Sequence, residues 1–164
     1  MGSDQILRTT GFVLLLAAGA AAAAYDANDV KLGATERDIK QRFPNAHCRE
    51  LEWPSRAADR RCDDSRITFA GVDASVTFYV KKNSVEGFDV RFDQRELDRV
   101  VKYLRGRYGE PYTEIGLPYK PEAPAKVEWQ AKDEQARLTA DPSRRRASLL
   151  VWRGTFEQEI YKVR

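Results

Sequence analysis

Histidine, methionine and cysteine are scarce in this chain of 164 residues, which has one histidine, one methionine and two cysteines. The sequence has no His-Glu-x-x-His metal motif, no Gly-x-Ser-x-Gly elbow and no phosphate-binding glycine loop. These absences remove the usual sequence signatures of zinc peptidases, α/β-hydrolases and nucleotide-binding enzymes. We therefore predict that the protein is not an enzyme and has no catalytic residue, no cofactor and no metal ion.

His47 is the one side chain around which catalysis could still be built. A serine hydrolase could use it as the base, with Ser55, Ser65 or Ser75 as the nucleophile. The sequence gives no reason to choose among the three serines. Catalysis is therefore kept as an alternative that depends on His47 alone.

Long apolar runs are absent after residue 24, so no later segment is predicted to span a membrane. Before that point, Arg8 is followed by an apolar, alanine-rich run that is shorter than the about 20 residues of a membrane-spanning helix. With small residues at Ala22 and Ala24, this pattern is typical of a cleavable export signal. We predict that residues 1–24 are this signal. Residues 25–164 are then one domain that is soluble in a bacterial periplasm or secreted.

The net charge of +3 is only mildly basic, and no nucleic-acid-binding module is recognisable, so nucleic acid is not an expected partner. Seven Phe, seven Tyr and three Trp indicate a folded domain with a hydrophobic core rather than a disordered chain.

Cys48 and Cys62 are predicted to form a disulfide bond, because an exported protein folds in an oxidising compartment. The bridge would close a loop of about 15 residues that has no clear period, and would stabilise the fold by roughly 3 kcal/mol. The alternative is a metal site, since His47 precedes Cys48 and two aspartates, residues 63–64, follow Cys62. Zinc sites usually need four well-spaced thiolate or imidazole ligands, which favours the disulfide.

Two helices are predicted, and each is followed by strands. Thr35 and Asp38 make a capping box at the start of a short helix that Pro44 ends. Asp93 caps a longer amphipathic helix, which ends at Gly109. Alternating apolar residues predict strands near 67–69, 76–80 and 88–92, with residues 81–84 as a hairpin turn.

The strand pattern returns about 60 residues later in the chain. Ile67 and Phe69 correspond to Val127 and Trp129; Val76, Phe78 and Val80 to Ala136, Leu138 and Ala140; Val90 and Phe92 to Leu150 and Trp152. We interpret this as an internal repeat of residues 33–92 and 93–152, although two alternating patterns also match easily by chance. The predicted fold class is α+β: tandem α-β-β-β units that form an antiparallel sheet with the helices packed on one face.

Arg144, Arg145 and Arg146 lie between two predicted strands, at what we expect to be the tip of a hairpin. One interpretation is a solvated turn. The other is an anion-binding tip for lipid head groups, lipopolysaccharide or an acidic partner. Trp53, inside the loop between the cysteines, could be a contact anchor or could fold back on the domain.

Four prolines make residues 111–124 an extended, irregular connector, in which Tyr112 and Tyr119 could face a partner. Near the C-terminus, Phe156 and Ile160 have helical spacing. They predict a short terminal helix that packs on the sheet edge or docks on another chain.

Residues 32–44, Leu-Gly-Ala-Thr-Glu-Arg-Asp-Ile-Lys-Gln-Arg-Phe-Pro, and residues 107–111, Arg-Tyr-Gly-Glu-Pro, resemble the capped-helix and Gly-Pro pattern of the SmpA/OmlA family of small envelope proteins. The tandem order of helix and antiparallel sheet is similar to the β-lactamase inhibitor protein fold. Members of the first family are typically lipoproteins that support outer-membrane assembly, whereas this chain has no cysteine before Cys48. Members of the second group bind a hydrolase through loops and the concave face of the sheet.

Both resemblances imply a non-catalytic protein that binds other proteins. We therefore predict an exported protein-binding or envelope-assembly module, stabilised by one disulfide bond. The alternative is a proteinaceous inhibitor of a periplasmic or secreted hydrolase. The expected partner is an envelope or secreted protein, with anionic lipid or lipopolysaccharide as a further candidate.

Overall fold

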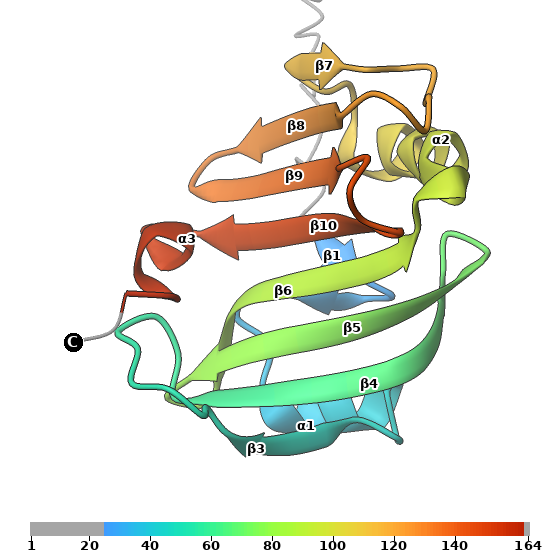
Figure 1. Cartoon of the computed structure of the whole chain (residues 1–164). Coiled ribbons are helices and arrows are strands. Elements are labelled where there is room, and N and C mark those ends of the chain that lie inside the picture. Colours follow the sequence, from blue (N-terminus) through green and yellow to red (C-terminus); the bar gives the residue numbers. More distant parts are fainter. Residues whose placement is uncertain (1–24, 163–164) are drawn as a thin grey trace, which may run out of the picture.

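The fold is dominated by an antiparallel sheet of eight strands, shown in a computed structural model that describes residues 25–162 (Figure 1). The predicted export signal, residues 1–24, lies outside the described residues. The strand order is β3-β4-β5-β6-β10-β9-β8-β7. In that order the strands are β3 (His47–Glu50), β4 (Arg60–Phe69), β5 (Val72–Lys81), β6 (Ser84–Asp93), β10 (Arg146–Arg153), β9 (Glu134–Ala140), β8 (Ala125–Ala131) and β7 (Thr113–Ile115).

A small hairpin, β1 (Asp26–Ala27) and β2 (Val30–Lys31), and three α-helices complete the described residues. The helices are α1 (Glu36–Arg42), α2 (Leu97–Tyr108) and α3 (Phe156–Glu159), and a 3-10 turn, η1 (Gln94–Glu96), precedes α2. The predicted α+β class is confirmed. Within residues 25–162, none of the helices combines the length and the apolar character needed to cross a membrane.

Local sequence signals account for the helix ends and for the central hairpin. At α1, the Asp38 backbone N–H donates to the Thr35 hydroxyl and the Thr35 N–H donates to the Asp38 carboxylate, so the predicted capping box is present. Asp93 caps η1 rather than α2 itself, which begins four residues later. The turn between β5 and β6 places Lys82 and Asn83 at φ 49° and 59°, as a two-residue hairpin requires.

Aromatic side chains of both longer helices pack against phenylalanines of the sheet. The Phe43 ring at the end of α1 lies 5.4 Å from that of Phe78, and the Tyr103 ring of α2 lies 5.7 Å from that of Phe69. In Figure 1, α1 lies behind β3 and β4. The third helix, α3, joins a second, smaller cluster with Tyr79 of β5.

Four strands follow each of the two longer helices, where three were predicted. The missed strands, β3 and β7, have only four and three residues and are mostly polar and exposed. Because neither shows apolar alternation, no sequence signal marked them. They are strands because their backbones pair with β4 and β8.

In β10, the residues that the proposed repeat matches to core residues are shifted by one position along the strand. Leu149 and Val151 point into the main core, whereas Leu150 and Trp152, the residues matched to Val90 and Phe92, belong with the second cluster. The matches in β8 and β9 are core residues, as predicted. The two halves of the sheet meet at β6 and β10, each the last strand of its half. Common ancestry of the halves stays a prediction.

Candidate functional site

The face of the sheet that does not line the main core carries many polar side chains, and we call it the open face. Side chains alternate along a strand, so each core residue has neighbours that point to the open face. In Figure 1 this face is turned towards the viewer, with α1 and the β1–β2 hairpin behind the sheet.

A continuous row of six residues crosses the centre of the open face. Successive members are directly opposite one another on β4, β5, β6, β10, β9 and β8: Asp63, Thr77, Asp89, Leu150, Arg137 and Glu128. Leu150 is the only apolar member and is half-buried. The row therefore places one apolar side chain between two charged halves.

Arginines neutralise the carboxylates of this row. Arg61 donates two hydrogen bonds to Asp63, at 2.8 and 2.6 Å, and the Thr77 hydroxyl donates a third at 2.7 Å. Burial raises the pKa of Asp63, but these hydrogen bonds outweigh it and leave the pKa below its usual value. Asp89 is held in the same way, by Arg91 at 2.7 Å.

Arg137 links the row to α3. Its guanidinium donates to Glu128 at 2.8 Å and to Glu157 of α3, and it lies 5.0 Å above the ring of Trp152. Burial raises the pKa of Glu128, and hydrogen bonds from Arg137 and Lys126 lower it by more. Hydrogen bonds within the protein thus hold the charged groups of the row in place.

One end of the open face is closed by α3 and by residues 51–59, the connection between β3 and β4. The Phe156 ring packs on Tyr79, at 5.4 Å, and over Gly87, where an added Cβ would come within 2.6 Å of it. A glycine inside a strand signals such a close approach, so Gly87 is the residue whose identity could have indicated this contact. Tyr79 and Trp152 are buried beneath this cover.

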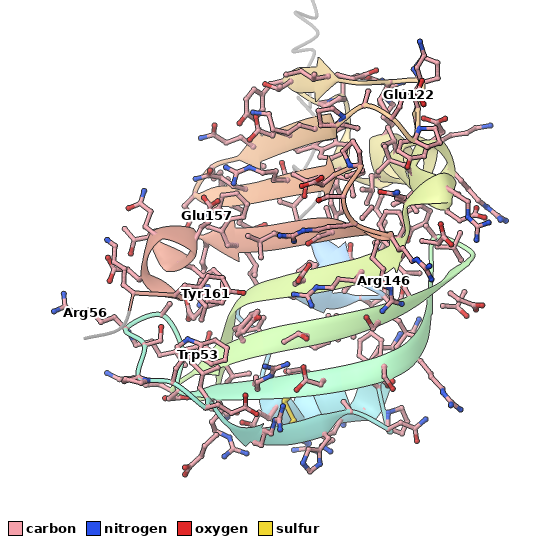
Figure 2. The ribbon with its side chains drawn as sticks, in the orientation of Figure 1. Trp53, Arg56, Glu122, Arg146, Glu157 and Tyr161 are labelled. Carbon is pink, nitrogen blue, oxygen red and sulfur yellow. A yellow bond between two sulfur atoms is a disulfide. The ribbon has the colours of Figure 1, made fainter. Side chains whose placement is uncertain are left out.

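Trp53 adopts the second of its two predicted arrangements and folds back on the domain. Its indole N–H donates to the Ile160 carbonyl at 2.7 Å, and its ring stacks on Tyr161 at 5.9 Å. Figure 2 shows Trp53 and Tyr161 side by side. The Ser55 hydroxyl adds a hydrogen bond to the Glu159 carbonyl at 3.1 Å.

The predicted disulfide between Cys48 and Cys62 is confirmed, and it joins directly opposite residues of β3 and β4. In the part of the chain that the structure describes, Glu36 is the one carboxylate grouped with the two sulfurs, and it is hydrogen-bonded to Arg60 at 2.5 Å. Because the sulfurs are bonded to each other, neither is a thiolate that could take part in the alternative metal site.

His47 is exposed on the edge strand β3. Within residues 25–162 no hydrogen bond joins it to Ser55, Ser65 or Ser75: Ser55 donates to α3, and Ser75 accepts from Arg146. The geometry offers no reason to prefer one of the three serines as nucleophile.

The three arginines occupy the turn between β9 and β10, as predicted, except that Arg146 is already the first residue of β10. Arg144 and Arg146 line a hollow on the open face. Arg145 is not among the residues lining it, and its backbone carbonyl accepts from the Gln94 N–H at 3.2 Å. Figure 2 shows Arg146 at the opposite end of the sheet from Trp53.

The two tyrosines of the proline-rich connector have different surroundings. Tyr112 is 63% exposed and directly precedes β7. Tyr119 is half-buried against the main core, and its backbone N–H donates to Asp98 at 2.9 Å. The connector is not irregular throughout, because residues 113–115 form β7.

Comparisons with protein-family models, curated proteins and solved structures gave no match to this chain. The candidate site therefore rests on the geometry of the open face.

Proposed function

We propose that this protein is an exported, non-catalytic module that binds an envelope or secreted protein through the open face of its sheet. The row of six residues across the face is the observation that carries the proposal. A half-buried Leu150 lies between fixed ion pairs, and a preorganised surface of this kind loses little conformational freedom when it binds. Fixed charges also select a partner of complementary pattern.

Two further features support export and the choice of the face. The disulfide bond is compatible with an oxidising compartment. Trp53 is held by the C-terminal segment, which favours binding through the face over insertion of this loop into an enzyme. In this proposal the two halves of the sheet are tandem units, with the longer helices on the face away from the partner.

A pull-down from bacterial envelope extract tests the proposal, with the disulfide-bonded protein as bait. The matched variants are Leu150→Lys, on the open face, and Lys102→Glu, on the exposed side of α2. We expect one protein to be retained in stoichiometric yield by the wild type and by Lys102→Glu. Leu150→Lys should lose it, because a long charged side chain would replace the apolar group at the centre of the interface.

Melting curves of both variants establish that they are folded, and the purified partner is then titrated against each. Equal retention by all three proteins would overturn the proposal. The identity of the partner separates the two functions: a hydrolase that loses its activity at one equivalent indicates an inhibitor, and a structural envelope protein indicates an assembly module.

A further inference from the structure

A hollow of about 340 Å³ lies on the open face at the tip of the β9–β10 hairpin. Its floor is a row of three directly opposite residues, Lys126, Thr139 and Ser148, on β8, β9 and β10. Arg144 and Arg146 also line it. Three cations therefore surround one space of the size of a small ligand.

Two of these three cationic groups, Arg144 and Arg146, form no ion pair within the described residues. Among the described residues, neither Arg144 nor Arg146 has a carboxylate within 4.0 Å. Within residues 25–162, the one side-chain hydrogen bond of Arg146 is a long contact of 3.5 Å to the Ser75 hydroxyl. Lys126 is the exception, since it pairs with Glu128 at 3.2 Å and keeps its other N–H groups for a ligand.

One carboxylate, Asp141, also lines the hollow, and it is hydrogen-bonded within the turn. It accepts from the Ser143 hydroxyl at 2.7 Å and from the Ser143 backbone N–H at 2.8 Å. The Ser148 hydroxyl donates to Asp89 at 2.5 Å, which turns its proton away from a ligand. The donors left for a ligand are therefore the two guanidinium groups, the ammonium group and the Thr139 hydroxyl.

We propose that this hollow is a binding site for a phosphate group, next to the protein-binding row and formed by different residues. Guanidinium groups match the oxygens of a phosphate in a two-pronged fashion. A phosphate monoester carries a charge of about −1.5 to −2 and three acceptor oxygens, which suits three cations better than a singly charged carboxylate does. The turn, residues 141–145, has no large apolar side chain to insert into a membrane. Charge recognition is therefore the mode of binding.

Arg145→Gln is the matched control, because it removes the same charge from the same turn at a residue that does not line the hollow. The full folded protein is titrated with inorganic phosphate at constant ionic strength. It is separately incubated with phosphatidylcholine vesicles with and without phosphatidic acid. We expect Arg146→Gln to weaken binding by about tenfold, the loss of one charge-assisted hydrogen-bond pair. Arg145→Gln should change binding by less than about twofold, since this side chain does not line the hollow and its charge acts only through solvent.

The two probes identify the source of the phosphate. Binding of inorganic phosphate that Arg146→Gln weakens supports a soluble ligand. Binding only to vesicles with phosphatidic acid, with the same difference between the variants, supports a lipid head group. Equal weakening by both variants would show general charge attraction and would overturn the site, as would no binding of either probe by the wild type. The phosphate and vesicle assays do not depend on the protein partner that Leu150→Lys tests. Failure of the phosphate site is therefore distinguishable from failure of the proposed protein-binding function.

Discussion

Asp26 has the least exposed carboxylate of the described ion pairs, with 2% of its side chain accessible. Arg107 donates to both of its oxygens, at 2.9 and 2.7 Å, and the Tyr108 hydroxyl donates to its backbone carbonyl at 2.7 Å. These contacts fasten the β1–β2 hairpin to the end of α2. A buried carboxylate of this kind depends on its cation, because it has lost most of its hydration.

Replacement of Arg107 with methionine should therefore lower the free energy of unfolding by about 3 kcal/mol. The control is Arg105→Met in the same turn of α2, which removes a surface pair with Glu114 and should cost much less. Urea unfolding of the two variants measures the difference. Equal losses would mean that the Asp26 pair contributes no more than a surface contact.

At the scale of elements, the sequence predicted what local signals determine. Thr35 and Asp38 mark the start of α1, and residues 81–84 mark a turn, because each signal lies within a few residues of its effect. In β10 the predicted core residues were one position away from the observed ones. Residues 149–152 are all apolar, so the sequence shows no alternation that tells which of them face the core.

The candidate site was less predictable because its parts are distant in the chain. Trp53 bonds to a carbonyl 107 residues away, and no local pattern carries that information. The row that crosses the open face depends on strand order and register, which place Asp63 and Leu150 in one line. Of the three arginines, only the register of β10 shows which two line the hollow.

The loop of residues 51–59 is held at both sides, by the disulfide bond at its base and by α3 at Trp53. Reduction of the disulfide should lower the free energy of unfolding by roughly 3 kcal/mol, since the bridge closes a loop of about 15 residues. The melting temperature before and after reduction measures this. The Cys48→Ser/Cys62→Ser variant is the control and should not respond to the reductant. An unchanged melt, or stoichiometric zinc in the oxidised protein, would contradict the prediction.

For the whole molecule, arginine–carboxylate pairs link stability to pH. Hydrogen bonds from Arg153, at 2.9 and 2.7 Å, hold the pKa of Glu86 below its usual value, and Asp63 and Glu128 are lowered in the same direction. A carboxyl group whose pKa is lower in the folded state stabilises the fold above its unfolded pKa, about 4. That stabilisation is lost as the pH falls through the folded pKa.

We therefore expect the free energy of unfolding to be nearly constant from about pH 7 to pH 5 and to fall below about pH 4. Glu86→Gln should be less stable than the wild type at neutral pH, and the difference should shrink in acid, because the wild-type carboxylate becomes protonated and loses its advantage. Glu122→Gln is the control, since Glu122 is exposed and has no ion pair among the described residues. Urea unfolding of the three proteins across this pH range measures the effect. If Glu86→Gln and Glu122→Gln gave parallel pH profiles, the Arg153 pair would not be a source of the acid sensitivity, and the arginines of the open face would be the next to replace.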